Sequence, residues 1–245
     1  MFNFAAHEWV IVVIGSLLIG INKTGIPGVL MVFVPILASI LPAKESTGFL
    51  LPLLLVADIF AITYYKRHTQ WKLLFRLIPF SLLGIVGGYF TMRALENAQI
   101  KPMIGIIVLV MLAVQAFRML RRNDEAIPTG IWFALVMGII AGYTTMVANA
   151  AGPAIAIFLL AMRLPKEQFV GTGAWYYFIV NITKVPLSAS LGLITAQSLL
   201  TGAVLIPAIA LGAFIGIKLL PLIPQKVFQA VILIIAAAGA LRLLF

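Results

Sequence analysis

Apolar residues in this chain are grouped into long segments that are separated by short polar loops. A helix that crosses a membrane needs about 20 mostly apolar residues. A helix also satisfies its backbone hydrogen bonds without water, so such segments predict an all-α integral membrane protein. Six segments fit this description: Gly48–Tyr65, Leu73–Thr91, Met103–Leu120, Val170–Leu191, Leu199–Leu220 and Val227–Leu244.

Two further apolar stretches, Trp9–Leu41 and Trp132–Leu160, are interrupted by short polar or glycine-containing breaks. The breaks lie at Asn22–Gly28 and at Asn149–Pro153. The apolar run after each break is short for a complete crossing and is typical of a half-helix. Each stretch therefore predicts a broken or re-entrant helix pair.

Composition supports the membrane assignment and excludes several functions. Of 245 residues, 63% are hydrophobic and 10% are charged, whereas soluble domains carry about 25% charged residues. The chain has no cysteine, and its two histidines, His7 and His68, are far apart. We find no nucleophile–base set and no cluster typical of a metal site. We expect no enzymatic activity, cofactor, metal or nucleic-acid partner, despite the net charge of +10.

Basic residues predict the orientation, because cytoplasmic loops carry an excess of Lys and Arg. The loops after Gly48–Tyr65 and after Met103–Leu120 are the richest in these residues. This orientation requires each broken stretch to return to its starting side or to cross twice. We expect a multi-pass protein of the plasma (inner) membrane with both termini extracytoplasmic. The basic residues then left outside are Lys44, Arg93, Lys101 and Arg242.

The two halves of the chain resemble each other, which predicts one domain over 1–245 built from repeats at 9–122 and 129–245. Each half would hold one broken pair and three spans. Because three crossings are an odd number, the second half would begin on the opposite side of the membrane and lie inverted relative to the first. Inverted repeats with broken helices are typical of secondary transporters. The matched residues include Asp58 with Asn181 (spacing 123), Lys23 with Asn149 (126), and Gly84 and Gly88 with Gly212 and Gly216 (128).

The four matched glycines form two pairs with a spacing of four residues, which lets membrane helices approach closely. We expect them to pack helices within one protomer. A homodimer interface is the alternative.

The breaks predict a site for a small anion. A helix that begins there would direct unpaired N–H groups and a partial positive charge toward the membrane interior. The alternative is a pair of kinks that neighbouring side chains satisfy. The candidate substrate-binding residues are Asn22, Lys23, Thr24, Gly25, Gly28, Asn149, Gly152, Asn181 and Lys184.

Three ionisable residues lie inside apolar segments: Lys23, Asp58 and Lys184. A charge at the bilayer centre costs at least about 2.5–3.5 kcal/mol, so each needs a partner or a function. Two cations against one carboxylate leave a positive charge that an anion could neutralise. Asp58 could form a structural ion pair with one of the lysines, or it could carry a proton for coupling. Lys184 could instead extend toward the membrane surface.

The motif Gly-Ile-Asn-Lys-Thr-Gly-Ile-Pro-Gly (20–28), followed by Pro42, Pro52 and Asp58, resembles the first half of the TauE/SafE sulfite exporter (TSUP) family. Residues 141–153, Ala-Gly-Tyr-Thr-Thr-Met-Val-Ala-Asn-Ala-Ala-Gly-Pro, resemble its second half, as do Leu-Pro-Lys-Glu (164–167) and Phe-Val-Gly-Thr (169–172). The resemblance implies a secondary transporter, and more specifically an exporter, of sulfite, sulfonates or related small organic anions. An anion channel and an uptake permease are the alternatives.

Overall fold

The computed structural model describes residues 2, 4–25, 28–120, 130–162 and 164–219. This part of the chain contains helices and no strands, so the predicted all-α fold is confirmed. The helices are α1 (Ala6–Thr24), α2 (Leu30–Ile40), α3 (Ala43–Tyr65), α4 (Trp71–Ala94), α5 (Asn97–Leu120), α6 (Ile131–Ala148), α7 (Gly152–Ala161), α8 (Lys166–Ser190) and α9 (Ala196–Leu219).

Five predicted spans correspond to α3, α4, α5, α8 and α9, and each helix begins before its apolar segment. Leu191 lies one residue past α8, and Leu220 lies outside the described residues. In α3, for example, the polar residues Lys44 and Glu45 form part of the first turn. By length and composition α1, α3, α4, α6 and α9 could each cross a membrane, which supports a multi-pass membrane protein. The predicted span Val227–Leu244 and the basic residues Arg121, Arg122, Arg163, Lys226 and Arg242 lie outside the described residues.

Both broken helix pairs are present. The second member of each pair is short, with 11 residues in α2 and 10 in α7. The first members, α1 with 19 residues and α6 with 18, are long enough to cross. We expected the second helix to begin near Pro27-Gly28, but α2 begins at Leu30, because Gly28 has φ +108°, outside the helical region.

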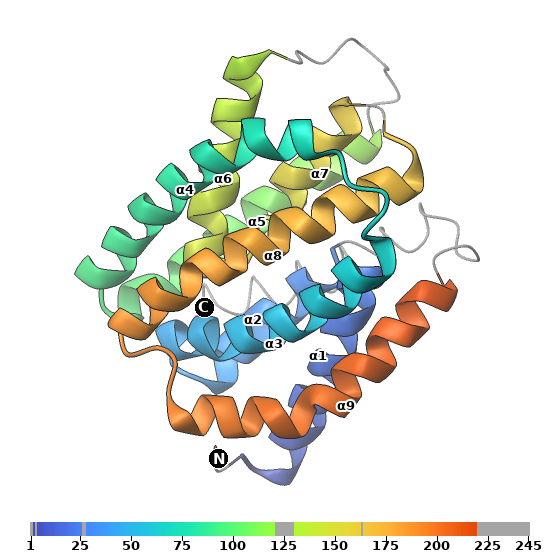
Figure 1. Ribbon diagram of the computed structural model, residues 1–245. Coiled ribbons are helices and arrows are strands. Elements are labelled where there is room, and N and C mark those ends of the chain that lie inside the picture. The colour runs from blue at the N-terminus through green and yellow to red at the C-terminus, as the bar shows by residue number, and fades with distance from the viewer. Residues whose placement is uncertain (1, 3, 26–27, 121–129, 163, 220–245) are drawn as a thin grey trace.

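The helices pack as interlocked halves (Figure 1). Helices α3 and α8 lie against each other, α4 packs on α6, and α1 packs on α9. One hydrophobic cluster is formed mainly by α1, α2, α3 and α5, with buried residues of α9. The other is formed by α4, α6, α7 and α8. Helix α4 of the first half therefore completes the second cluster, and α9 of the second half packs against the first. The inverted relation of the repeats stays a prediction.

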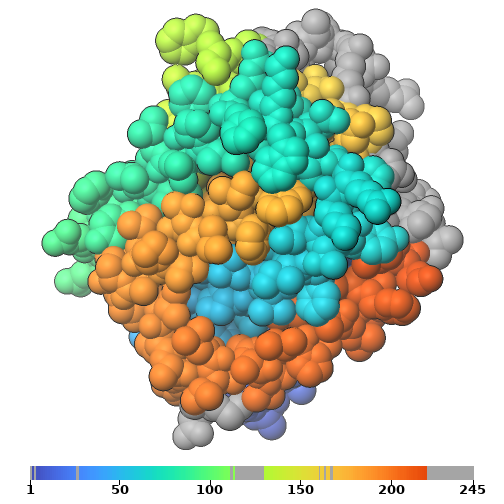
Figure 2. Space-filling model, viewed as in Figure 1, coloured from blue at the N-terminus to red at the C-terminus, as the bar shows by residue number. Residues whose placement is uncertain are grey.

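Large apolar side chains remain exposed on the outer surfaces of α4 and α9, and Figure 2 shows these two helices with α8 on one face of the molecule. Such a surface suits contact with lipid, which is as apolar as these side chains. The exposed side chains include Phe75, Leu83, Val86 and Phe90 of α4, and Leu199, Leu200, Val204, Leu211 and Phe214 of α9.

Glycines bring the backbones of two helix pairs into contact. A side chain at Gly142 of α6 would collide with the backbone of Ser81 in α4, and one at Gly84 would collide with that of Ile139. In the same way, Gly20 of α1 faces the backbone of Ile209 in α9, and Gly212 of α9 faces that of Leu17. The prediction that the glycine pairs pack helices within one protomer is confirmed.

The α4–α6 contact makes a testable prediction. Gly142→Ala places a methyl group against the Ser81 backbone, which cannot move away without separating the two helices. We expect the free energy of unfolding to fall by about 1–3 kcal/mol, measured by thermal unfolding in detergent. Gly87→Ala on α4 is the matched control, because its nearest neighbour, Tyr143 Cδ2, would be 3.8 Å away. Equal melting temperatures for the two variants would contradict the packing argument.

Candidate functional site

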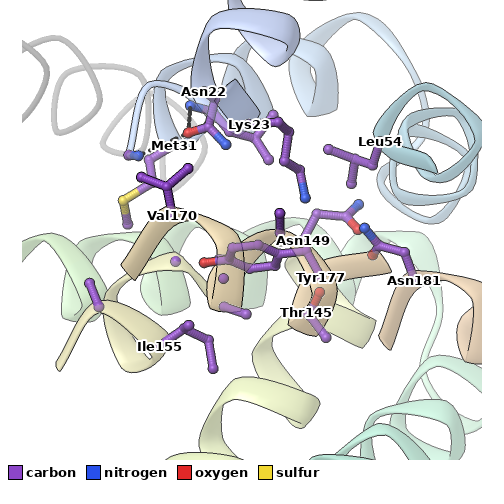
Figure 3. A pocket seen from close by; sticks show the side chains of 18 of the residues that line it. Asn22, Lys23, Met31, Leu54, Thr145, Asn149, Ile155, Val170, Tyr177 and Asn181 are labelled. Atoms are coloured by element: carbon purple, nitrogen blue, oxygen red, sulfur yellow. Dashed lines mark hydrogen bonds between the residues drawn. The ribbon is translucent and has the colours of Figure 1, made fainter. Parts of the chain in front are cut away.

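A cavity of about 60 Å³ lies where the two helix breaks face each other (Figure 3). One water needs about 10–15 Å³ of such space, so the cavity can hold a group equivalent to several waters. Its polar lining is formed by Asn22, Lys23, Thr145, Asn149, Tyr177 and Asn181. Its apolar lining includes Met31, Leu54, Ile155, Leu159 and Val170.

Lys23 is the cation in this lining and is 7% exposed. Its Nζ lies 2.7 Å from Oδ1 of Asp58, which is fully buried in α3. The same Nζ lies 4.1 Å from the ring centroid of Tyr177, in cation–π contact. Lys23 is therefore held between a carboxylate and an aromatic face. Asp58 thus forms the structural ion pair with a lysine that the sequence left as one of two interpretations.

Asn181 of α8 links this ion pair to the second half of the chain. Its Nδ2 donates to Asp58 Oδ2 at 2.6 Å, and its Oδ1 accepts a long hydrogen bond of 3.4 Å from Lys184 Nζ. Asp58 and Asn181 are the residues matched at a spacing of 123. The two matched positions therefore meet at the contact between α3 and α8.

Lys184 is fully buried, so the alternative that it extends to the membrane surface is wrong. Its Nζ donates to the Thr145 carbonyl at 2.8 Å and to Asn149 Oδ1 at 2.6 Å. Thr145 lies in the last turn of α6, where its carbonyl also accepts from the Asn149 N–H at 3.1 Å and where a cation is favoured. Lys184 therefore caps the broken end of α6. It does not line the cavity.

Asn149 ends α6 in the left-handed conformation, with φ 50°, which Asn tolerates better than most residues. Its Nδ2 donates to the Thr47 carbonyl of α3 at 3.2 Å. The Thr47 hydroxyl in turn donates to the Val147 carbonyl at 3.1 Å. The second break is thus fixed both to α8 and to the beginning of α3.

At the first break, backbone groups that we expected to bind an anion are already bonded. Asn22 Oδ1 accepts from the N–H groups of Gly28 at 2.8 Å and Leu30 at 3.3 Å, so Asn22 caps α2. The Gly25 N–H donates to the Ile21 carbonyl. Gly25 and Gly28 line the cavity, but their amides are occupied. Asn22 Nδ2 has no acceptor among the described residues, and Ile26 and Pro27 lie outside them.

Two other predicted residues have different positions. The Thr24 hydroxyl donates to the carbonyls of Gly20 and Ala213, so it belongs to the α1–α9 contact and does not line the cavity. Gly152 does line the cavity, and α7 begins there as predicted. The beginning of α7 therefore presents the partial positive charge of a helix N-terminus to the cavity.

Tyr177 is the cavity residue that sequence reasoning missed. It lies four residues before Asn181 and seven before Lys184, which is the spacing of one helix face. This spacing could be read from the sequence. An aromatic residue in an apolar segment, however, has no need of a polar partner and so did not stand out.

The polar cluster carries a net charge of +1 with Lys23, Lys184 and Asp58 ionised. The Lys23–Asp58 contact is the only ion pair among the described residues, and the hydrogen-bond partners of Lys184 are neutral. A monovalent anion in the cavity would balance this charge. The described residues contain no group of three or more His, Cys, Asp or Glu that could hold a metal.

The role of Lys184 as a cap is testable. Lys184→Met leaves Asn149 Oδ1 without its donor in a buried site, while the Thr145 carbonyl keeps only the Asn149 N–H. We expect the free energy of unfolding to fall by about 1–3 kcal/mol for the acceptor left unsatisfied, measured by thermal unfolding in detergent. Lys218→Met, an exposed lysine in the last turn of α9, is the matched control. A Lys184→Met protein as stable as this control would contradict the capping role.

Comparison with known protein families gives one match. The model of the family described as "Sulfite exporter TauE/SafE" matches residues 12–243. No curated protein and no solved structure matches the chain. The family match covers both breaks, the Lys23–Asp58 pair and Lys184. The chain therefore belongs to the TauE/SafE sulfite exporter family of membrane transporters.

Proposed function

We propose that this protein is a secondary transporter that exports a small sulfur-containing or organic anion, such as sulfite or a sulfonate, and that Lys23 binds the anion in the central cavity. The observation that carries the proposal is that Lys23 lines the cavity and belongs to a buried cluster of two lysines and one carboxylate. Membership of a family named for sulfite export supports the substrate class and the direction.

The cavity offers an anion several donors. The Lys23 ammonium has three N–H groups, of which one is directed at Asp58 by the 2.7 Å contact. Asn22 Nδ2 and the beginning of α7 at Gly152 add further positive character. Asn149 and Asn181 line the cavity with amides that are held in place by Thr47 and Asp58. The apolar wall suits the organic part of a short sulfonate.

Proton coupling through Asp58 follows from the same geometry. An anion that binds Lys23 competes with Asp58 for the ammonium group. A buried carboxylate that loses its cation is costly to keep charged and is neutralised by taking up a proton. Anion binding and proton uptake would then occur together. This gives the ion pair a role in transport in addition to its structural one.

The experiment that tests the function is flux of radiolabelled sulfite and methanesulfonate in proteoliposomes, with and without an imposed pH gradient. Saturable exchange driven by the gradient would support the transporter. Large passive currents would indicate the anion channel, and net accumulation in the cytoplasmic direction would indicate the uptake permease. Either of these two results would overturn the proposal.

We also propose that the protein lies in the plasma (inner) membrane with both termini extracytoplasmic. The support is the excess of Lys and Arg in the loops assigned to the cytoplasm. Labelling of single cysteines introduced near residue 5 and near residue 69 tests this, because the chain has no cysteine of its own. The first should react from outside and the second from inside.

Removal of the Lys23 charge should weaken anion binding. Lys23→Gln keeps a polar side chain in the cavity but lacks the cation, and a charge-assisted hydrogen bond is lost. We expect the affinity for methanesulfonate to fall at least about tenfold, or about 1.4 kcal/mol, in calorimetric titrations. Lys218→Gln removes an exposed charge and should have no effect. Unchanged affinity in a folded Lys23→Gln protein would reject the role of Lys23.

Asp58→Asn tests coupling separately from binding. Asn keeps a similar shape and can still accept from Asn181, but it cannot exchange a proton. We expect the variant to lose accumulation driven by a pH gradient while it retains downhill exchange, both measured in proteoliposomes. An Asp58→Asn protein that still concentrates the anion would show that Asp58 does not couple transport to protons.

A further inference from the structure

A second polar depression lies away from the central cavity, at the end of the bundle where α3 begins and α4 and α8 end. Its volume is about 420 Å³, and it shares no lining residue with the central cavity. The lining residues are Lys44 in the first turn of α3, Tyr89, Met92 and Arg93 near the end of α4, and Ser190 and Leu191 at the end of α8. These ends of α4 and α8 lie on the left in Figure 1.

The depression carries two cations without a matching carboxylate. Neither Lys44 nor Arg93 forms an ion pair with any described residue. Both belong to the few basic residues that the orientation leaves outside the cytoplasm. The excess of basic residues in cytoplasmic loops gives no reason for two basic residues to gather in one depression on the opposite side. An Arg guanidinium is suited to paired hydrogen bonds with an oxyanion, and Lys adds a second positive charge.

Hydroxyl groups complete the donor set. Ser190 Oγ donates to the Leu187 carbonyl at 2.8 Å and has a second, longer contact of 3.4 Å to Tyr89 Oη, which accepts. The Tyr89 hydroxyl proton has no acceptor among the described residues. Tyr89 can therefore donate to a bound group. The depression thus combines a guanidinium, an ammonium and a phenol, which are all donors.

Two sources of oxyanion can reach this place. The depression lies at the end of the exposed apolar surface of α4, next to Phe90, where the acyl chains of a lipid would lie. The phosphate of an anionic lipid headgroup can pair with an Arg guanidinium and a Lys ammonium. Lys44 is also one helical turn before Thr47, which accepts from Asn149 of the central site. Lys44 therefore lies close in the chain to a residue that holds the wall of the central site.

We propose that Lys44, Arg93 and Tyr89 form a second oxyanion site, separate from the central cavity, that binds a phosphate or sulfonate group at the extracytoplasmic surface. The bound group is the headgroup of an anionic lipid or a free oxyanion. The chemistry of recognition is the same in both cases. The site does not depend on anion binding by Lys23.

The test uses a Lys23→Gln background, which removes the central cation. One arm measures retention of phosphatidylglycerol by native mass spectrometry after release from nanodiscs that also contain phosphatidylcholine. The other arm measures calorimetric binding of inorganic sulfate in nanodiscs of phosphatidylcholine alone. We expect binding in at least one arm to fall at least about tenfold in Lys44→Gln/Arg93→Gln. The arm that responds identifies the source of the oxyanion.

The matched control is Lys72→Gln/Arg76→Gln, which removes the same two charges from exposed positions at the opposite end of α4. It should leave binding in both arms unchanged. Tyr89→Phe, which removes a single hydroxyl, should weaken the same binding by a smaller factor and keeps the test valid if the double variant does not fold. The proposal would be overturned if the Lys72→Gln/Arg76→Gln control lost as much binding as Lys44→Gln/Arg93→Gln. It would also be overturned if no variant altered binding in either arm.

Discussion

Two buried ammonium groups, of which only Lys23 has a carboxylate partner among the described residues, are the constraint on which the arrangement of this bundle depends. A charged side chain in the membrane interior persists only where acceptors surround it. Lys23 obtains the carboxylate of Asp58, and Lys184 obtains the Thr145 carbonyl and the Asn149 side chain. That carbonyl lies in the last turn of α6, where the helix dipole favours a cation. The break in the helix and the buried cation therefore require each other.

This cluster can form only if four helices approach closely at the same level of the bundle. Glycines in the α4–α6 and α1–α9 contacts allow the backbones to touch, and this brings both broken pairs to the centre. Helices α3 and α8 then meet, and the Asp58 carboxylate contacts both Lys23 of α1 and the Asn181 amide of α8. Packing and electrostatics thus support each other, since the close backbone contacts exclude water and the exclusion of water strengthens the polar contacts.

The site is asymmetric although the sequence predicts two similar halves. At the spacing of 123 residues, Asn181 corresponds to Asp58, whereas Lys184 corresponds to the buried Ala61. One half therefore supplies the cation that lines the cavity, and the other supplies the cation that holds the cavity wall in place. In the proposed function the substrate competes with Asp58 for Lys23, which would couple binding and release to the protonation state of Asp58.

Much of this follows from the sequence alone. Runs of apolar residues determined the helices, Asn22–Gly28 and Asn149–Pro153 determined both breaks, and the cost of burying charge singled out Lys23, Asp58 and Lys184, because each of these signals is local. Only the tertiary structure decided that Lys23 faces the cavity and that Lys184 caps α6. It also decided that Thr24 packs against α9. The direction of a side chain depends on which helix lies beside it, and the helices that provide these partners are more than thirty residues apart in the chain.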